Sequence, residues 1–124
     1  MNVLIIGSGG REHALAIKIA ESKNIEKLLC LPGNAGISKV CELVKIKQDE
    51  NSAILDFIKK NKIDFVVIGP EQPLSIGLAD ILRNENIVCF GPGEKAAKLE
   101  SSKAFAKYFM SKYKIPTASF QVFN

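Results

Sequence analysis

The sequence predicts an α/β fold of the doubly wound, Rossmann-like class, built on a parallel sheet of about five strands. Short runs that are apolar throughout alternate with segments of helical periodicity along most of the 124 residues. Such runs are typical of strands covered on both faces, as in a parallel sheet. Glycine-rich loops follow several of the runs, and a doubly wound fold binds its ligands at that end of its strands.

The strands are predicted at residues 2–6, 27–31, 40–46, 64–69 and 87–91. Helical periodicity occupies residues 12–21 and 53–60 and returns in a third segment that opens at Pro73, a residue favoured in a first helical turn. The apolar face of this third segment contains Leu74, Leu78, Ile81 and Leu82. Between the second and third strands, "PGNAGIS" is too short and glycine-rich for a crossover helix, so we expect a loop or a single turn.

The last part of the chain departs from this alternation. Ser101 or Ser102 can cap a helix with an aromatic stripe, and Ile115-Pro116 ends that helix. The stripe consists of Phe105, Tyr108, Phe109 and Tyr113. The following "ASFQVF" alternates like a strand. Because one helix and one strand cannot complete a domain, we expect a Rossmann-like domain at 1–100 and the start of a second domain at 101–124 of a longer enzyme. The alternative is a terminal helix and strand that pack back onto the sheet.

Composition narrows the classes of ligand. The 17 Lys and Arg exceed the 13 Asp and Glu by four, but no basic block interleaved with aromatic residues occurs, which disfavours nucleic acid and suits a small anionic substrate. Cys30, Cys41 and Cys89 lack CxxC spacing, so we expect reduced, buried thiols and a cytoplasmic protein. We expect neither a signal peptide nor a membrane span.

The stretch "IIGSGGREHAL" joins the first strand to the first helix through a glycine loop, which favours a bound phosphate. A dinucleotide fingerprint needs G-x-G-x-x-G and an acid at the end of the second strand. Gly7 and Gly9 fit, but Glu12 replaces the third glycine and "LCLPGN" contains no acid. NAD is therefore disfavoured, and a monophosphate at Gly9 and Gly10 is favoured. A glycine turn that only lets strand and helix pack stays an alternative.

The loops at residues 7–11 and 69–72 should face each other, since the first and fourth strands flank the switch point of a doubly wound sheet. There Glu71 can accept hydrogen bonds from sugar hydroxyls or an amine, or simply favour the start of a helix. Asn34 can contact the ligand, although a left-handed turn position fits it better. His13 fits a polar contact better than a general base. The residues thus indicate a binding domain without a catalytic centre.

Five motifs follow one another along the chain: "GSGGREHAL", "PGNAG", "GPEQPLSIG", "FGPGEKAAKLESSKAFAK" and "IPTASF". In order and spacing they resemble the N-terminus of the phosphoribosylamine-glycine ligase family, also called glycinamide ribonucleotide synthetase. The resemblance implies a Rossmann-like pre-ATP-grasp domain followed by the first helix and strand of an incomplete ATP-grasp domain. Alternatives are another ATP-grasp ligase or carboxylase of purine synthesis, a nicotinamide-dependent oxidoreductase domain and a stand-alone nucleotide-sensing module.

The resemblance also implies a reaction, in which ATP phosphorylates glycine and the amine of 5-phosphoribosylamine attacks the acyl phosphate. By resemblance, Lys103 contacts the ATP phosphates, and the residues of the phosphoribosylamine site are Gly9, Gly10, Arg11, Glu12, Asn34, Pro70 and Glu71. ATP and magnesium, or manganese, are expected to bind mainly outside these 124 residues, which contain no catalytic residue or metal ligand and are inactive alone. We expect a monomer that binds small molecules and neither nucleic acid nor membranes.

Overall fold

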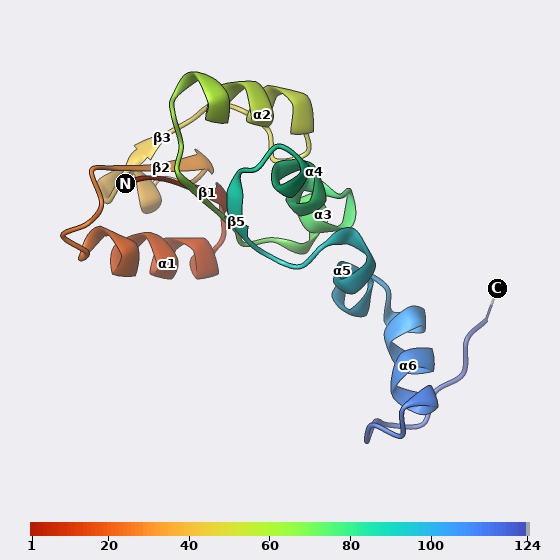
Figure 1. Cartoon of the computed structure of the whole chain (residues 1–124). Coiled ribbons are helices and arrows are strands. Elements are labelled where there is room, and N and C mark those ends of the chain that lie inside the picture. Colours follow the sequence, from red (N-terminus) through yellow and green to blue (C-terminus); the bar gives the residue numbers. More distant parts are fainter. Residues whose placement is uncertain (124) are drawn as a thin grey trace.

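The structure, a computed structural model, describes residues 1–123 and is built on a five-stranded sheet in the order β3-β2-β1-β4-β5 (Figure 1). Every neighbouring pair in the sheet is parallel. The strands are β1 (Asn2–Gly7), β2 (Lys27–Pro32), β3 (Glu42–Leu43), β4 (Phe65–Ile68) and β5 (Val88–Phe90). The α/β class, the parallel sheet and the number of strands are thereby confirmed.

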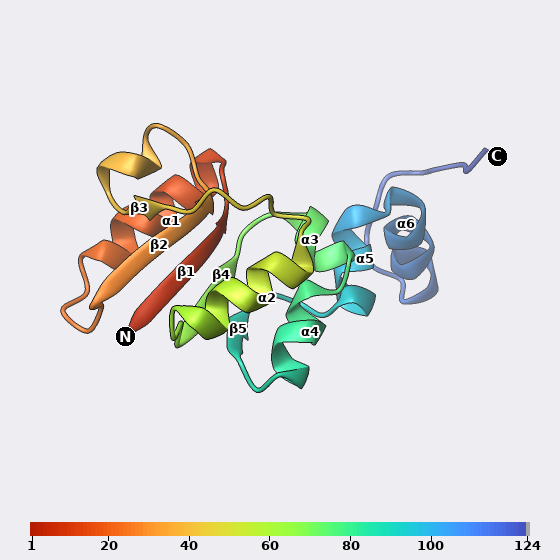
Figure 2. The same cartoon turned by 90° about the horizontal axis from the view of Figure 1, so that it is seen from above.

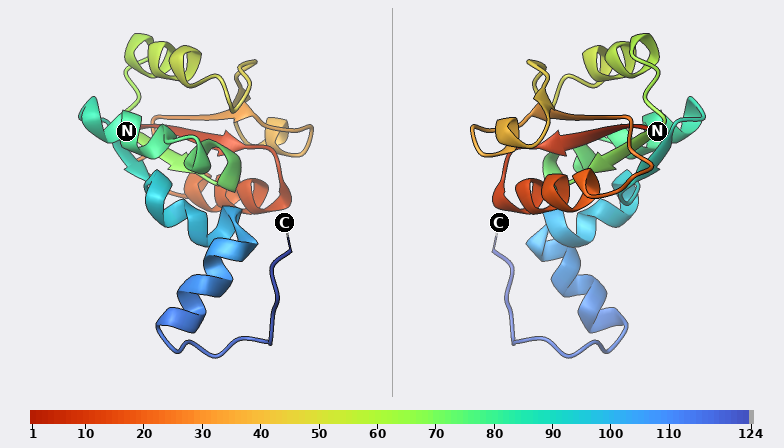
Figure 3. Two further views of the ribbon diagram at one scale, coloured as in Figure 1. Left: turned by 90° about the vertical axis from the view of Figure 1, so that its right-hand side faces the viewer. Right: turned by 90° about the vertical axis from the view of Figure 1, so that its left-hand side faces the viewer.

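Helices cover both faces of this sheet, as the view along it shows (Figure 3). The helical elements are α1 (Gly10–Ala20), the 3₁₀ turn η1 (Ile37–Lys39), α2 (Asn51–Lys60), α3 (Glu71–Ser75), α4 (Leu78–Asn84), α5 (Glu94–Ser101) and α6 (Lys103–Lys112). Helix α1 lies on one side and α2 on the other, while α6 projects away from the sheet (Figures 2 and 3). The single turn expected in "PGNAGIS" is η1.

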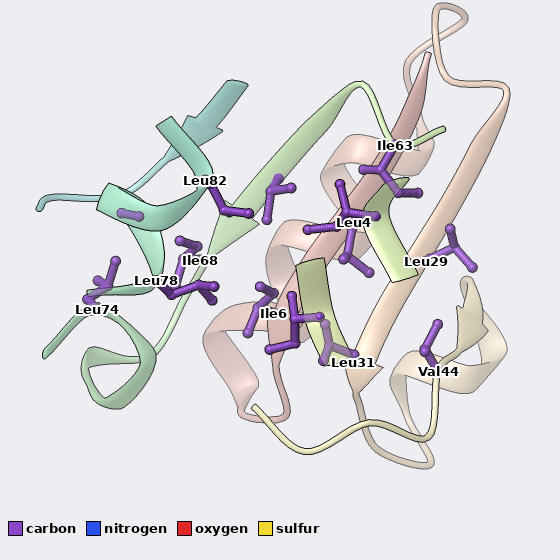
Figure 4. Close-up of a cluster of buried hydrophobic side chains, with 14 of the residues drawn as sticks. Leu4, Ile6, Leu29, Leu31, Val44, Ile63, Ile68, Leu74, Leu78 and Leu82 are labelled. Carbon is purple, nitrogen blue, oxygen red and sulfur yellow. The ribbon is translucent and has the colours of Figure 1, made fainter. Parts of the chain in front are cut away.

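Two apolar clusters explain why the central strands are apolar throughout. Leu4 and Ile6 of β1 point toward α2 and α4, and Figure 4 shows them beside Leu29, Leu31, Ile68, Leu78 and Leu82. Val3 and Ile5 point the other way and pack with Ala16 of α1. Successive strand residues face opposite sides. A strand between two helical layers therefore buries both sets, and the Rossmann-like interpretation of these runs is correct.

Three predicted elements differ from the structure because contacts distant in sequence decide them. The third strand is only Glu42–Leu43, since the Ile46 N–H donates to the Val44 carbonyl within a tight turn and leaves the ladder with β2. The helix predicted from Pro73 divides into α3 and α4 at Gly77, whose φ of 80° suits glycine. Helix α5 forms in a segment for which no helix was predicted.

The cause of α5 is a cap supplied by another helix. Asp80 of α4 accepts a hydrogen bond from the Glu94 N–H at 2.7 Å, which satisfies a donor that the helix itself leaves free. A Cβ on the preceding Gly93 would lie 2.5 Å from Asp80 Oδ1, so this close approach favours a glycine. A side chain fourteen residues upstream is not recognisable as a cap from local sequence.

The predicted helix of the terminal segment is confirmed and its predicted strand is wrong. Ser102, rather than Ser101, caps α6 through a 3.3 Å hydrogen bond from the Phe105 N–H. Residues 115–123 form no strand; they run beside α6, where Lys107 donates to Thr117 Oγ1 at 2.7 Å. A strand needs a ladder partner, and no described strand pairs with this segment.

Candidate functional site

Three loops meet where β2, β1 and β4 end. The Gly33 N–H donates to the Gly7 carbonyl at 3.1 Å, and the Gly69 N–H donates to the Ile6 carbonyl at 3.0 Å. Because β4 pairs directly with β1, the loop after β4 lies against the glycine loop after β1. The predicted juxtaposition of residues 7–11 and 69–72 is therefore confirmed.

Glu12 is buried at the centre of this junction, with 3% of its surface exposed. Its Oε2 accepts a hydrogen bond from the Gly9 N–H at 2.7 Å, and its Oε1 accepts one from Arg11 Nε at 3.1 Å. The carboxylate thus caps the first turn of α1, where the helix dipole favours negative charge. The Gly9 N–H, expected to face a phosphate, is already occupied.

The Glu12 side chain also explains most of the loop glycines. A Cβ on Gly7 would lie 2.6 Å from Glu12 Cγ, one on Gly9 would lie 2.9 Å from Oε2, and one on Gly69 would collide with Oε1. Gly10 differs, because a Cβ there would meet no heavy atom within 4 Å. Three of these glycines therefore accommodate the protein's own carboxylate, and of the four only Gly10 borders open space.

Arg11 lies at the rim of the loop. Its side chain is 55% exposed, and besides Glu12 it faces Glu100 of α5, with Nη1 4.0 Å from Oε1. Glu71 is also exposed, in the first turn of α3, and no ion pair within residues 1–123 holds its carboxylate. Pro70 precedes it, half-buried, as the residue before α3. The rim thus presents a cation on the loop after β1 and a carboxylate at the start of α3.

Asn34 is engaged within the protein. Its Nδ2 donates to the Ser8 carbonyl at 2.7 Å, and its Oδ1 accepts from the N–H groups of Gly36 at 2.8 Å and Ile37 at 2.9 Å. The turn role is confirmed, but the left-handed position is wrong: Gly33 has the positive φ, at 68°. Asn34 joins the loop after β2 to the glycine loop and so holds the rim in place.

His13 and Cys30 complete the surroundings as packing groups. A Cβ on Gly36 would lie 2.8 Å from His13 Cε1, so the imidazole rests against the loop after β2. Cys30 is buried, and its Sγ donates to the Gly7 carbonyl at 3.4 Å. Burial, then the neighbouring Cys41 and Glu12, raise the pKa of the Cys30 thiol to about 12. A thiol with such a pKa is a poor nucleophile at neutral pH.

Lys103 lies apart from the glycine loop in the structure's contacts. It is the exposed first residue of α6, directly after the Ser102 cap, and no described residue forms an ion pair with it. A cation in the first turn of a helix is unfavourable unless a nearby anion compensates its charge. Lys103 therefore has a charge available to a ligand.

Other features of the described chain lie outside this junction. Within residues 1–123, no group of three or more His, Cys, Asp or Glu side chains could hold a metal ion. No helix in that range is long and apolar enough to cross a membrane. An open hollow of about 360 Å³ at the start of α5 is lined by Asp80, Gly93, Glu94, Lys95 and Ala96, none of them a predicted site residue.

Sequence reasoning placed the junction correctly and missed how its interior is filled. Neither the burial of Glu12 nor the reason for Gly69 was predicted, and the contact between Arg11 and Glu100 was not foreseen. The available signal was a glycine at the end of the fourth strand facing a carboxylate in the first helical turn.

Comparison with known proteins gives consistent relatives. The profile of the family described as "Phosphoribosylglycinamide synthetase, N domain" matches residues 1–100. The phosphoribosylamine–glycine ligase of Mesorhizobium japonicum is 54% identical over 100% of this chain and 29% of its own length. That of Caldanaerobacter subterraneus is 46% identical over 100% of this chain and 30% of its own length. The chain thus spans less than a third of these relatives.

Solved structures share the fold. The phosphoribosylamine–glycine ligase of Thermotoga maritima superimposes with a TM-score of 0.68 at 32% identity, over 98% of this chain and 27% of that one. N5-carboxyaminoimidazole ribonucleotide synthetase from Thermus thermophilus gives a TM-score of 0.65 at 24% identity, over 93% of this chain and 31% of that one. The second likeness concerns the fold alone.

Proposed function

The chain belongs to the phosphoribosylglycinamide synthetase N-domain family, and from this we propose that it is the N-terminal part of a phosphoribosylamine-glycine ligase of purine biosynthesis. In the proposed reaction, ATP phosphorylates the carboxylate of glycine, and the amine of 5-phosphoribosylamine displaces phosphate from the acyl phosphate. The products are glycinamide ribonucleotide, ADP and phosphate. Because the chain spans 29% of its relative, this activity belongs to a longer polypeptide.

The part assigned to this chain is to hold phosphoribosylamine. The open space before Gly10, with Arg11 at the rim, suits the phosphate of the substrate. Backbone N–H groups at a helix start and a guanidinium are common partners of phosphate. Since Glu12 occupies the Gly9 N–H, Gly10 and Arg11 are the primary phosphate contacts in this proposal, while Gly9 and Glu12 form the floor beneath them.

Glu71 is proposed to accept hydrogen bonds from the sugar hydroxyls. Its carboxylate is exposed, free of ion pairs within residues 1–123, and two residues beyond Gly69, which packs against Glu12. Pro70 fixes the backbone on the approach to Glu71, and Asn34 steadies the opposite loop. Holding both ends of the sugar phosphate restricts its orientation, and such restriction lowers the entropic cost of the attack.

ATP and a divalent metal are implied by the ligase family. The described residues contain no cluster of three ligands for a metal, so we assign the metal and the phosphorylation of glycine to the remainder of the enzyme. Lys103 is proposed to contact the ATP phosphates, on the strength of its unanswered charge at the start of α6. We place the domain boundary at 100/101, just before the Ser102 cap, and propose a monomeric, cytoplasmic enzyme.

A chimera tests this function. Residues 1–124 replace the matched N-terminal region of the Mesorhizobium japonicum ligase, and ADP release is measured with glycine and phosphoribosylamine. We expect activity that requires both substrates. Glu71→Ala should raise the KM for phosphoribosylamine by about tenfold or more, because a hydrogen bond to a charged group is lost, and leave the KM for glycine unchanged.

Glu42→Ala is the matched control, since Glu42 is an exposed carboxylate on β3, paired with Lys27 at 3.5 Å. It should leave both KM values unchanged. The 124-residue chain alone should release no ADP. A folded chimera without activity would contradict the proposal, as would glycine-dependent ADP release by the isolated chain.

A further inference from the structure

We infer that Glu12 is a specificity-determining residue: its side chain fills the inner half of the crevice, so the loop accepts one phosphate at Gly10 and Arg11 and rejects a diphosphate. The inference rests on the proposed function, because it concerns the anion bound at that same site. It assigns Glu12 a role exerted through occupancy and positioning, without direct contact to the substrate.

The first support is the volume that Glu12 occupies. Its side chain lies so close to the backbone of Gly7, Gly9 and Gly69 that a methyl group on any of these residues would overlap it. In a dinucleotide-binding loop, glycines let the pyrophosphate approach the backbone between strand and helix. Here the same glycines bring the backbone close to Glu12, which leaves no room there for a second phosphate.

The second support is that Glu12 already accepts a backbone hydrogen bond that an inner phosphate would need. The Gly9 N–H, which would bind an inner phosphate, donates to Glu12 Oε2 at 2.7 Å. A phosphate at that position would also meet a carboxylate of like charge at close range. The Gly10 backbone and the exposed nitrogens of Arg11 are still available to an anion on the outer side.

Arg11 gives Glu12 its positioning role. The bond from Arg11 Nε to Glu12 Oε1, at 3.1 Å, fixes one edge of the guanidinium. Neither terminal nitrogen is hydrogen-bonded to the buried carboxylate, and Nη1 lies 4.0 Å from Glu100 Oε1. A guanidinium held by one edge keeps its other donors in a defined fork for phosphate.

The test compares two probes, ribose 5-phosphate and ADP-ribose, titrated into the isotope-labelled 124-residue chain. Glu12→Ala removes both volume and charge, whereas Glu12→Gln removes the charge and keeps the volume and an acceptor for Gly9. We expect Glu12→Ala to raise the affinity for ADP-ribose by about tenfold or more relative to ribose 5-phosphate. Glu12→Gln should raise it by less than about threefold.

Glu100→Ala is the matched control, because it removes the other carboxylate beside Arg11 without opening the crevice. It should leave the ratio of the two affinities unchanged. If Glu12→Ala does not fold, Glu12→Ser replaces it, since a hydroxyl can still accept the Gly9 N–H. Folding is verified from the dispersion of amide signals before each titration.

Two results would overturn the inference. One is a folded small-residue variant with no gain in ADP-ribose affinity; the other is an equal gain in Glu12→Gln, which would show that charge alone excludes the diphosphate. The proposed function is tested separately, by the binding of ribose 5-phosphate to the wild-type chain. If the wild-type chain does not bind ribose 5-phosphate while Glu12→Ala gains affinity for ADP-ribose, the proposed function and the acceptance of one phosphate are contradicted, and the exclusion of a diphosphate by Glu12 is kept.

Discussion

The carboxylate of Glu12 lies 2.7 Å from the backbone N–H of Gly9, beneath a loop whose glycines otherwise suggest a nucleotide. The start of α1 would otherwise favour an external anion, but here the protein's own Glu12 carboxylate binds the Gly9 N–H. In the proposed site, an external phosphate therefore binds at Gly10 and Arg11.

Gly69→Ala should destabilise the fold, whereas Gly10→Ala should not. A Cβ on Gly69 would collide with the buried carboxylate of Glu12, and overpacking of this kind typically costs about 1–3 kcal/mol. A Cβ on Gly10 would meet no heavy atom within 4 Å, so the free energy of unfolding of Gly10→Ala should change by less than about 0.5 kcal/mol. Urea denaturation measures both. Equal stability of the two variants would show that the Glu12 side chain lies elsewhere.

Asn34→Ala should lower the free energy of unfolding by about 1–3 kcal/mol, because it leaves hydrogen-bonding groups of Ser8, Gly36 and Ile37 without their partner. Ser38→Ala is the control. Its Oγ only donates to the Ala35 carbonyl at an exposed site, so the change should be below about 0.5 kcal/mol. Thermal or urea unfolding distinguishes them, and a neutral Asn34→Ala variant would disprove the positioning role.

Cys30 should make the free energy of unfolding fall as the pH rises into the alkaline range. The pKa of its buried thiol is raised from 9.0 to about 12, so on raising the pH the unfolded chain loses this proton first. The stabilisation is therefore complete below pH 9 and is lost between pH 9 and 12, by up to roughly 1.4 kcal/mol for each pH unit. The measurement is urea unfolding across that range, and Cys30→Ala should show a shallower slope. Identical slopes would contradict the assignment.

Hydrogen exchange should separate the sheet from the terminal segment. Amides of β1, which lies between β2 and β4, should exchange slowest, because they open only when the sheet opens. Amides of residues 117–123 should exchange without protection, since they belong to no helix or strand. Protected amides at 118–123 would restore the strand that sequence alternation predicted. Mass spectrometry of the deuterated chain resolves these segments.

Elements fixed by neighbouring residues were predictable from the sequence, and elements fixed by contacts between distant residues were not. The central strands were predictable because residues such as Leu4 and Ile5 must be buried on opposite faces, a property written in their own run. The start of α5 was not, since its cap comes from Asp80. The shortness of β3 was not either, because the turn at Val44 depends on how the chain leaves β2.

The site shows the same division. The facing loops followed from strand order, which the fold class implies, and the exposure of Glu71 agrees with its proposed role. The occupation of the Gly9 N–H could not be read from composition or spacing, because it depends on the rotamer of Glu12. The pattern located the junction of the loops, and side-chain packing decides which backbone groups are left for a ligand.

The most direct test of the central claim is a titration of ribose 5-phosphate into the isotope-labelled 124-residue chain, followed by amide chemical shifts. The claim predicts saturable shifts that are largest at Gly10, Arg11 and Glu71, with no comparable change in α2 or α6. Shifts confined to other regions, or no saturable shift in a folded chain, would contradict it.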